Sequence, residues 1–234
     1  MEKSNKLLPA LLIALGITCL GWFIYTGINH LAYRDRQVTV RGLAEKEVMA
    51  NKVTWPLVVK TMGNNLTQLY DQINANNSVV LKFLKDNGIS ESEISVNEPQ
   101  VFDKDAQTYN SGNMPYRYLV TEVITVTSSQ VDKVNALMKR QAELLKQGVA
   151  LANDYQYQTL YEYTGLNDIK PEMIAKATAN AREAAKKFAD DSGSDLGKIK
   201  TASQGQFSID DRDSYTPYIK NVRVVTSITY YLED

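Results

Sequence analysis

LTQLYDQINANNSVVLKFLKDNG, residues 66–88, is the stretch in which the spacing of apolar side chains changes from that of a strand to that of a helix. Apolar residues one helical turn apart fall on one face, and they are Leu66, Leu69, Tyr70, Ile73, Val80, Leu81 and Leu84. Gly88 then provides a natural C-terminal stop. This stretch is therefore expected to form an amphipathic helix between strands.

Strand-like alternation precedes this helix twice. A first strand is expected to begin at Val38 and Val40, and Gly42 allows a bend after it. Pro56 falls inside the second strand, and proline has no N–H to donate to a sheet, so we expect a sheet edge or a bulge there. One face of this second strand carries Val53, Trp55, Leu57 and Val59.

Two more strands and a helix are expected after Gly88. The first strand covers residues 93–102, with Pro99 near its end, and the second covers residues 116–127. Glu122 interrupts the apolar face of the second strand, which favours a bulge or an edge position. A helix capped by Ser129 and ended by Gly148 follows. The two strands are joined by a polar loop through Asp103, Asn110, Gly112 and Pro115.

The C-terminal part repeats the alternation of strand and helix. A strand with four tyrosines on one face is expected first, then a helix from Asp168, with Pro171 in its first turn, to just before Gly193. Strands near residues 199–207 and 222–232 complete the chain. The tyrosines are Tyr155, Tyr157, Tyr161 and Tyr163. The inner stripe of the helix is Ile169, Met173, Ala177, Ala181, Ala184 and Phe188, and its small alanines allow a close approach to a sheet.

These elements predict an α+β fold with the order ββαββαβαββ, in which about three helices cover an antiparallel or mixed sheet. One transmembrane helix precedes this fold. The expected organisation is a short tail (1–6), a transmembrane signal-anchor (7–29), a juxtamembrane linker (30–36) and the α+β domain (37–234).

The anchor prediction rests on residues 7–28, which contain no charge and are long enough to span a bilayer. A cleavable signal peptide would have a shorter apolar core and a small-residue cleavage site. Lys3 and Lys6 precede the helix, but basic residues also follow it, so the charge balance does not favour export. The very short N-terminal tail favours a signal-anchor with the folded domain in the bacterial periplasm.

Composition excludes several kinds of chemistry. The formal net charge is -1, so the chain has no excess positive charge with which to attract nucleic acid. The only cysteine, Cys19, and the only histidine, His30, lie in or beside the apolar segment, so the folded domain has no Ser-His-Asp triad, Cys-His pair or histidine-rich metal site. We therefore name no catalytic, cofactor-binding or metal-ligating residue and expect no cofactor.

Three other patterns have a structural and a functional interpretation. Residues 193–198, GSDLGK, depart from a phosphate-binding loop in glycine spacing and follow a helix, so a helix stop is favoured. The acidic groups Asp103/Asp105 and Asp210/Asp211/Asp213 lack EF-hand spacing and are interpreted as solvated loops. The four tyrosines are interpreted as cross-strand packing, with a binding face or radical chemistry as the alternative.

Several stretches resemble the SIMPL-domain family of bacterial envelope proteins. They are Val38–Gly42, Leu84–Ile89 with Ile94–Val96, Tyr118–Val134, and Ala179–Ala189 followed by Gly193 and Leu196–Ile199. Leu43-Ala44 and Trp55-Pro56 depart from the family pattern. The resemblance implies an envelope location, ring-like or channel-like homo-oligomers in some members, and an association with protection from oxidative stress, with no established catalytic residues.

The leading hypothesis is a membrane-anchored, non-enzymatic envelope protein that acts by self-assembly or by binding an envelope partner. One alternative is an accessory subunit of a transporter or secretion system. The other is an envelope enzyme or redox scavenger that uses carboxylates, a Ser-Lys pair or the tyrosines.

Overall fold

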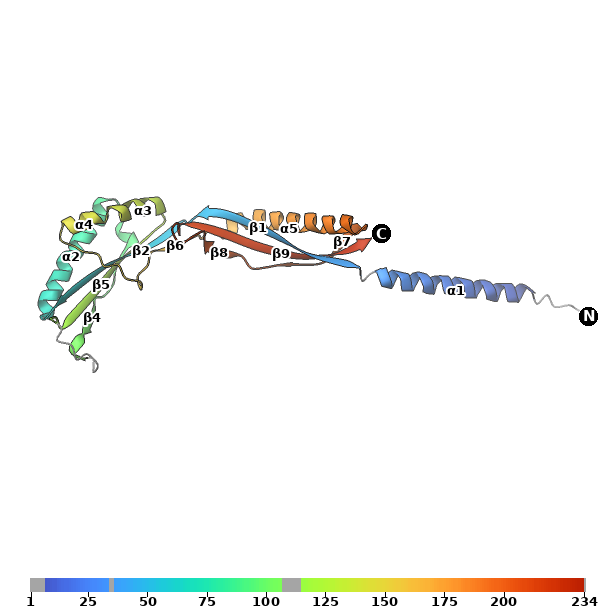
Figure 1. The fold of residues 1–234 in the computed structure, drawn as a ribbon, viewed down its shortest axis with the longest axis horizontal. Coiled ribbons are helices and arrows are strands. Elements are labelled where there is room, and N and C mark those ends of the chain that lie inside the picture. Colours follow the sequence, from blue (N-terminus) through green and yellow to red (C-terminus); the bar gives the residue numbers. More distant parts are fainter. Residues whose placement is uncertain (1–6, 34–35, 107–114, 234) are drawn as a thin grey trace, which may run out of the picture. The chain divides into compact units, whose positions relative to one another are not determined.

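The computed structural model of the chain describes residues 7–33, 36–106 and 115–233, and it has the expected α+β class. The described elements form two compact units, and the helix near the N-terminus is grouped with the first (Figure 1). Unit 1 comprises Met1–Lys46, Asn167–Ser208 and Val222–Asp234, and unit 2 comprises Glu47–Leu166 and Ile209–Asn221. Each unit has its own antiparallel sheet, where the sequence pattern predicted a single sheet.

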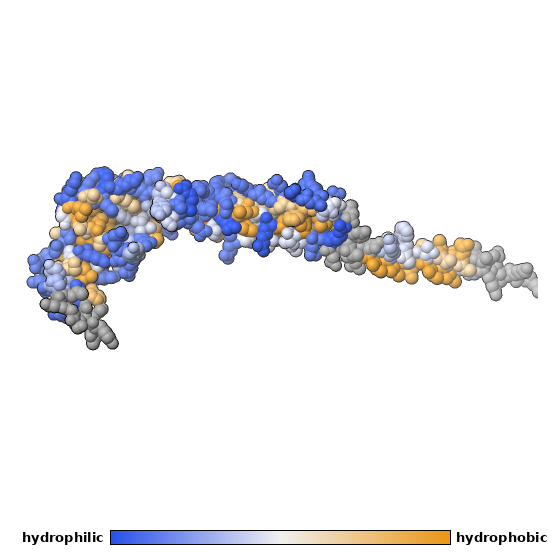
Figure 2. Space-filling view, in the orientation of Figure 1, coloured by the Kyte–Doolittle hydropathy of each residue, from blue (hydrophilic) through white to orange (hydrophobic). Residues whose placement is uncertain are grey.

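The N-terminal helix α1 (Leu7–Tyr33) exposes its apolar side chains. Within the described residues, one segment is long and apolar enough to cross a membrane, and it is Pro9–Ile28 of this helix. Its two threonine hydroxyls are satisfied internally, because Thr18 Oγ1 donates to the Ala14 carbonyl at 2.8 Å and Thr26 Oγ1 donates to the Trp22 carbonyl at 2.8 Å. This leaves the side chains of the helix surface mostly hydrocarbon (Figure 2).

Unit 1 is a sheet with one long helix on its face (Figure 1). Strand β9 is central, between β1 and β7, and also pairs with β8. The apolar positions of β9 alternate with outward-facing ones, and Val222, Val224, Ile228 and Tyr230 are buried as the sequence pattern predicts. The bounds are β1 Gln37–Met49, α5 Leu166–Asp191, β7 Asp195–Gln204, β8 Ser208–Asp211 and β9 Ile219–Glu233. Most of β8, the end of β1 and the start of β9 fall within unit 2.

Gly42 has a different role from the predicted one. Strand β1 continues through Gly42 without ending, and this residue faces α5. A Cβ at Gly42 would lie 1.9 Å from the carbonyl oxygen of Ala177 and 2.5 Å from the backbone nitrogen of Ala181. The helix is therefore in direct contact with the strand backbone, and only glycine leaves room for it.

The alanines of α5 make this contact, but its inner stripe differs from the expected one. The buried positions are Met173, Ala177, Ala181, Ala185 and Ala189. Phe188 is 61% exposed, so its predicted place in the core is wrong. The helix also begins before Asp168, which puts Pro171 beyond the first turn.

Unit 2 is a second sheet covered by helices (Figure 1). Strand β2 pairs with β5 along its whole length, in a register that sets Leu57 opposite Ile124 and Val59 opposite Glu122. Short strands β3 and β4 pair with the other edge of β5, and β6 pairs with the start of β2. The strands are β2 Lys52–Gly63, β3 Ile94–Val96, β4 Gln100–Asp103, β5 Tyr118–Ser128 and β6 Leu160–Glu162.

The predicted amphipathic helix is α2 (Leu66–Asp86), and Leu69, Ile73, Val80 and Leu84 of its predicted stripe are buried. Leu66 and Tyr70 are 44% and 61% exposed, so their predicted place on the buried face is wrong. Asn65 caps it by accepting from the N–H groups of Thr67 at 3.0 Å and Gln68 at 3.3 Å. Gly88 ends it in the left-handed region, with φ +78. A single helix was predicted next, but the structure divides it into two helices at Gln141. Its two parts are α3 Val131–Arg140 and α4 Ala142–Lys146, and single 3-10 turns occur at Glu91–Glu93 and Lys104–Ala106.

Two predicted strands are changed. The strand over residues 93–102 is broken before Gln100, so β3 and β4 are separate. The prediction of a strand through all four tyrosines is wrong, because β6 begins only at Leu160 and the preceding tyrosines lie in a loop. The element order after α1 thus has three strands between α2 and α3 and three after α5. In the polar loop after Asp103, the predicted residues Asn110 and Gly112 lie outside the described residues.

Candidate functional site

The residues considered for metal or phosphate binding have structural roles: the acidic groups form ion pairs, and residues 193–198 end a helix. Both acidic groups are paired with cations: Arg117 contacts Asp103 at 2.8 Å and Asp105 at 3.3 Å. Hydrogen bonds from Arg117 lower the pKa of Asp103. No cluster of three His, Cys, Asp or Glu side chains suited to a metal occurs in the described part of the chain.

The other acidic group stabilises the turn that carries it. Asp213 accepts from the hydroxyl of Thr216 and from Arg212 Nε, and these hydrogen bonds lower its pKa. Asp211 pairs with Lys220, whose side chain is largely buried. At residues 193–198, Gly193 (φ +68) follows the end of α5 and leads into β7, which confirms the helix stop.

The tyrosines expected on one face are divided between different surroundings. Tyr161 is half-buried, donates to Asn135 Oδ1 at 2.5 Å and packs edge-on against Tyr218. Burial raises the pKa of the Tyr161 phenol. Tyr163 donates to the Gly165 carbonyl at 3.0 Å, whereas Tyr155 is 95% exposed. The four phenols do not form one binding face.

A pocket lies where strand β2 lacks a second neighbour. On this edge, β6 pairs with Lys52 to Thr54, and the N–H of Ala152 donates to the Val58 carbonyl at 2.8 Å. Alternate residues of a strand direct their backbone groups to the same edge, so Pro56 faces this gap with a carbonyl and no N–H. The expected edge position is confirmed at Pro56 itself, because β2 has no neighbouring strand among the described elements at this point of its edge. Proline has no N–H, so no backbone donor is left unpaired there.

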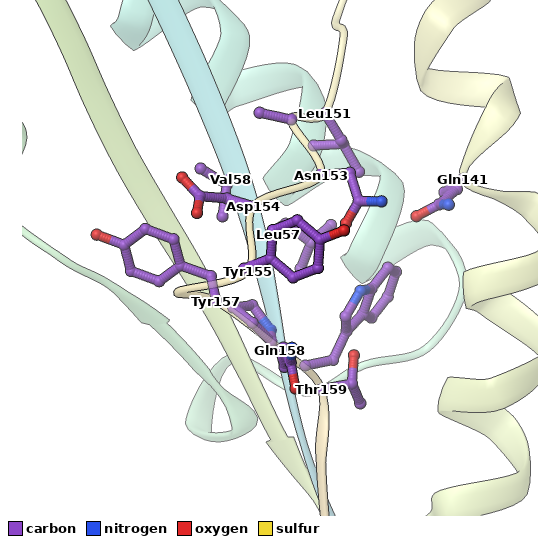
Figure 3. A pocket seen from close by; sticks show the side chains of 13 residues that line it. Leu57, Val58, Gln141, Leu151, Asn153, Asp154, Tyr155, Tyr157, Gln158 and Thr159 are labelled. Carbon is purple, nitrogen blue, oxygen red and sulfur yellow. The ribbon is translucent and has the colours of Figure 1, made fainter. Parts of the chain in front are cut away.

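This pocket, called the β2 pocket below, is formed by residues from three elements of unit 2 (Figure 3). Its volume is about 410 Å³. In Figure 3, Gln141 points from the junction of α3 and α4 toward the loop that carries Asn153 and Tyr155. The lining residues are Trp55, Pro56, Leu57, Val58, Gln141, Leu151, Ala152, Asn153, Asp154, Tyr155, Tyr157, Gln158 and Thr159.

The one formally charged group among these lining residues is neutralised within the protein. Lys60 Nζ lies 2.7 Å from Asp154 Oδ2, and the N–H of Gln156 donates to Asp154 Oδ1 at 3.0 Å. The hydrogen bond from Lys60 is the largest cause that lowers the pKa of Asp154. This ion pair joins the loop to β2 and leaves the pocket without a free charge.

A second unusual feature is a set of buried oxygen atoms in unit 2 without hydrogen-bond partners among the described residues. They are Thr61 Oγ1, Asn77 Oδ1 and Glu122 Oε2, and their residues are 6%, 8% and 3% exposed. Glu122 lies inside a continuously paired part of β2 and β5, so the expected bulge or sheet edge is wrong.

The register brings Thr61 and Glu122 to one face of the sheet. Glu122 lies opposite Val59 and Thr61 lies opposite Val120, so Thr61 and Glu122 are diagonal neighbours. On α2, Asn77 stands between Ile73, which belongs to the same apolar cluster as Val120, and Val80, which belongs to the cluster of Ile124. The polar residues therefore separate two apolar clusters of the same core.

An apolar surface surrounds strand β4, which among the described strands pairs only with β5. Phe102 and Met62 flank Leu119 in one cross-strand row, and they are 42% and 54% exposed. Leu66, Tyr70 and Val101 line a groove of about 380 Å³. Successive rows of a sheet face opposite sides, so Met62 and Phe102 lie on one face and Val101, with Leu66 and Tyr70, on the other. These five residues, on both sides of the edge strand, are called the β4 patch below, and Figure 2 shows hydrophobic surface on this unit.

The described residues thus define a class: two antiparallel α+β units, preceded in the chain by an apolar helix of membrane-spanning length. The SIMPL family model, which describes a protein of unknown function, matches residues 38–226. This match covers most of the chain, so the chain belongs to the SIMPL family, as its resemblance predicts. No curated protein matches the chain.

Proposed function

We propose that this protein is a non-enzymatic component of the bacterial envelope, held in the inner membrane by α1, with both units in the periplasm. It acts by self-association or by binding an envelope partner, in a role such as envelope or oxidative-stress protection. Support for the anchor comes from Pro9–Ile28, which is apolar, of membrane-spanning length and unburied by the rest of the chain. SIMPL proteins are envelope-associated, which supports the location.

The β4 patch is the observation that carries the self-association proposal. Soluble proteins seldom expose several large apolar side chains together unless the surface binds something. Strand β4 also has a free edge among the described elements, and its one charged residue, Asp103, is paired with Arg117. By contrast, strand β7 carries Lys198 and Lys200, and lysines on an edge oppose pairing with another chain. A second copy of β4, with its apolar flanks, suits the β4 patch.

We expect Phe102→Glu and Tyr70→Glu to reduce the mass of the detergent-solubilised full chain toward that of a monomer. A charge on either side of β4 would have to lose its water when two copies meet. Light scattering coupled to gel filtration measures the mass. Tyr215→Glu is the matched control, since Tyr215 is a 93% exposed tyrosine outside the patch. A wild-type chain that is already monomeric contradicts self-association.

Protease treatment tests the proposed orientation. Added protease is expected to digest both units in spheroplasts, where the outer barrier is open, and to leave them intact in whole cells. A cytoplasmic domain would survive in spheroplasts until the membrane is lysed. Such protection would contradict the envelope location. Exchanging residues 7–28 for an unrelated anchor then distinguishes simple tethering, which retains activity, from helix contacts in a transporter or secretion system.

A further inference from the structure

We propose that the β2 pocket binds an uncharged carbohydrate chain. Asp154 is held by Lys60, so a charged ligand of either sign would find no free counter-ion among the lining residues. Bringing an ion into such a pocket without a partner is unfavourable. The ligand is therefore neutral.

The polar groups of the pocket are amides and hydroxyls, and they are free to bind. Within the described ranges, no protein group hydrogen-bonds to the side chains of Gln141, Asn153, Gln158 or Thr159, all of which line the pocket. An amide can donate and accept, and a hydroxyl can do both. Sugar hydroxyls also donate and accept, so each can pair with either kind of group. A purely apolar ligand would leave these groups unpaired.

Aromatic side chains supply the remaining part of the recognition. Trp55 and Tyr155 line the same pocket, one buried in its wall and the other 95% exposed. An aromatic ring offers a flat apolar face with a polar tip. A sugar ring presents C–H groups on one face and hydroxyls around its rim, which matches the exposed ring of Tyr155 beside the free amides. Trp55 is 4% exposed and forms part of the pocket wall.

An extended peptide is the main competing neutral ligand, and the geometry of the edge opposes it. A peptide that adds to a sheet needs a row of free backbone groups. Here the free edge is confined to Trp55–Leu57, between the β6 pairing and the bond from Ala152 to Val58. Pro56 has no N–H, so this short gap offers few backbone groups. The carbohydrate is therefore favoured.

Trp55 is a built-in reporter for the test. The chain has two tryptophans, and Trp22→Phe in α1 leaves Trp55 as the single tryptophan. The Trp22→Phe full chain in lipid nanodiscs avoids the sugar headgroups of common detergents. Chitohexaose and maltohexaose are the two probes, and they distinguish an N-acetylated glycan of the cell-wall kind from a plain glucan. Calorimetric titration of the same samples provides an independent measurement.

We expect one of the probes to change Trp55 fluorescence saturably. Tyr155→Ala should weaken that binding by about three- to tenfold, the loss typical of one aromatic contact. Asn153→Ala and Gln141→Ala should weaken it as well, because each removes a free amide. Tyr155 and Asn153 are exposed and have no side-chain hydrogen bond in the described part, so their variants should fold.

The matched control is Tyr215→Ala, an equally exposed tyrosine outside the pocket, which should bind like the parent chain. Absence of saturable binding of both sugars at millimolar concentration overturns the proposal. Binding that Tyr155→Ala, Asn153→Ala and Gln141→Ala leave unchanged places the sugar elsewhere and also overturns it. The proposed envelope location determines only which glycans the β2 pocket would meet, and carbohydrate binding itself does not depend on it. The β4 patch variants test self-association and change no residue of the β2 pocket, so a failure of self-association would leave the sugar-binding result unaffected.

Discussion

Gly42→Val is expected to lower the free energy of unfolding of unit 1 by about 3 kcal/mol or more, the upper part of the range for overpacked cores. The first atom of any new side chain would lie 1.9 Å from the Ala177 carbonyl oxygen. This obstacle is backbone, so no change of rotamer relieves it. Strand β1 or helix α5 would have to move, and the packing of Val40 against Ala181 and Ala185 would be lost.

Hydrogen exchange of the full chain, followed by mass spectrometry, measures this effect separately in each unit. Amides of β1 and α5 should exchange faster in Gly42→Val, whereas those of β2 and β5 should keep their protection. Leu43→Val is the matched control, because Leu43 is the next residue of β1 and is 39% exposed. Valine favours strands, so intrinsic propensity would stabilise both variants. Unchanged protection of α5 in Gly42→Val would contradict the close contact.

The periodicity of the sequence was sufficient for elements whose packing repeats locally. Helix α2 was predicted from its apolar spacing, and its Leu69, Ile73, Val80 and Leu84 are buried. Strand β9 was predicted from strict alternation. In both, most turns or residue pairs have the same environment as the next, so a repeating pattern identifies most of the buried face. The exceptions are Leu66 and Tyr70, at the start of α2, which are exposed.

Features that depend on a distant neighbour were not predicted. Gly42 suggested a bend because its own sequence does not show that α5 packs on it. Phe188 suggested a core residue because it is large and apolar, but the stripe of α5 follows the small side chains instead. Contact with the strand backbone at Gly42 favours alanine over phenylalanine at these positions. A helix that packs this closely selects by size as well as by hydrophobicity.

The β2 pocket was missed for a related reason. It joins Pro56 to residues about a hundred positions later, and only the fold brings them together. The tyrosine pattern drew attention to residues 155–163, but it suggested a strand where residues 155–159 form a loop. Pro56 was the available signal, since a proline in a strand implies that one edge lacks a partner there. The charge of Asp154 gave no hint that Lys60 neutralises it.

Glu122 was noticed in the sequence, but as a sign of an irregular strand. In the structure it is 3% exposed in a regular strand, and Oε2 has no partner among the described residues. A buried polar atom without a hydrogen bond costs about 1–3 kcal/mol relative to a satisfied or apolar group. Glu122 and Asn77 together interrupt contact between the cluster around Ile73 and the cluster around Val80.

Glu122→Met is therefore expected to raise the free energy of unfolding of unit 2 by about 1–3 kcal/mol. Methionine is unbranched and nearly matches glutamate in length, so it fills the same space without a polar atom. Hydrogen exchange of β5 and α2 in the full chain measures the change directly. Glu98→Met is the control: Glu98 is exposed and has no recorded partner in the described part, so its effect should stay within about 0.5 kcal/mol.

Combining Glu122→Met with Asn77→Leu tests whether the two residues act as one polar interruption. Removing one side chain leaves the other buried beside an apolar neighbour, whereas removing both joins the two clusters into one core. The double variant should therefore be more stable than the sum of the two single changes, since residues that share an environment are not additive. Simple additivity would mean that Asn77 and Glu122 do not adjoin. Loss of stability in Glu122→Met would mean that this carboxylate has a favourable partner, and the unpaired assignment of Oε2 would be wrong.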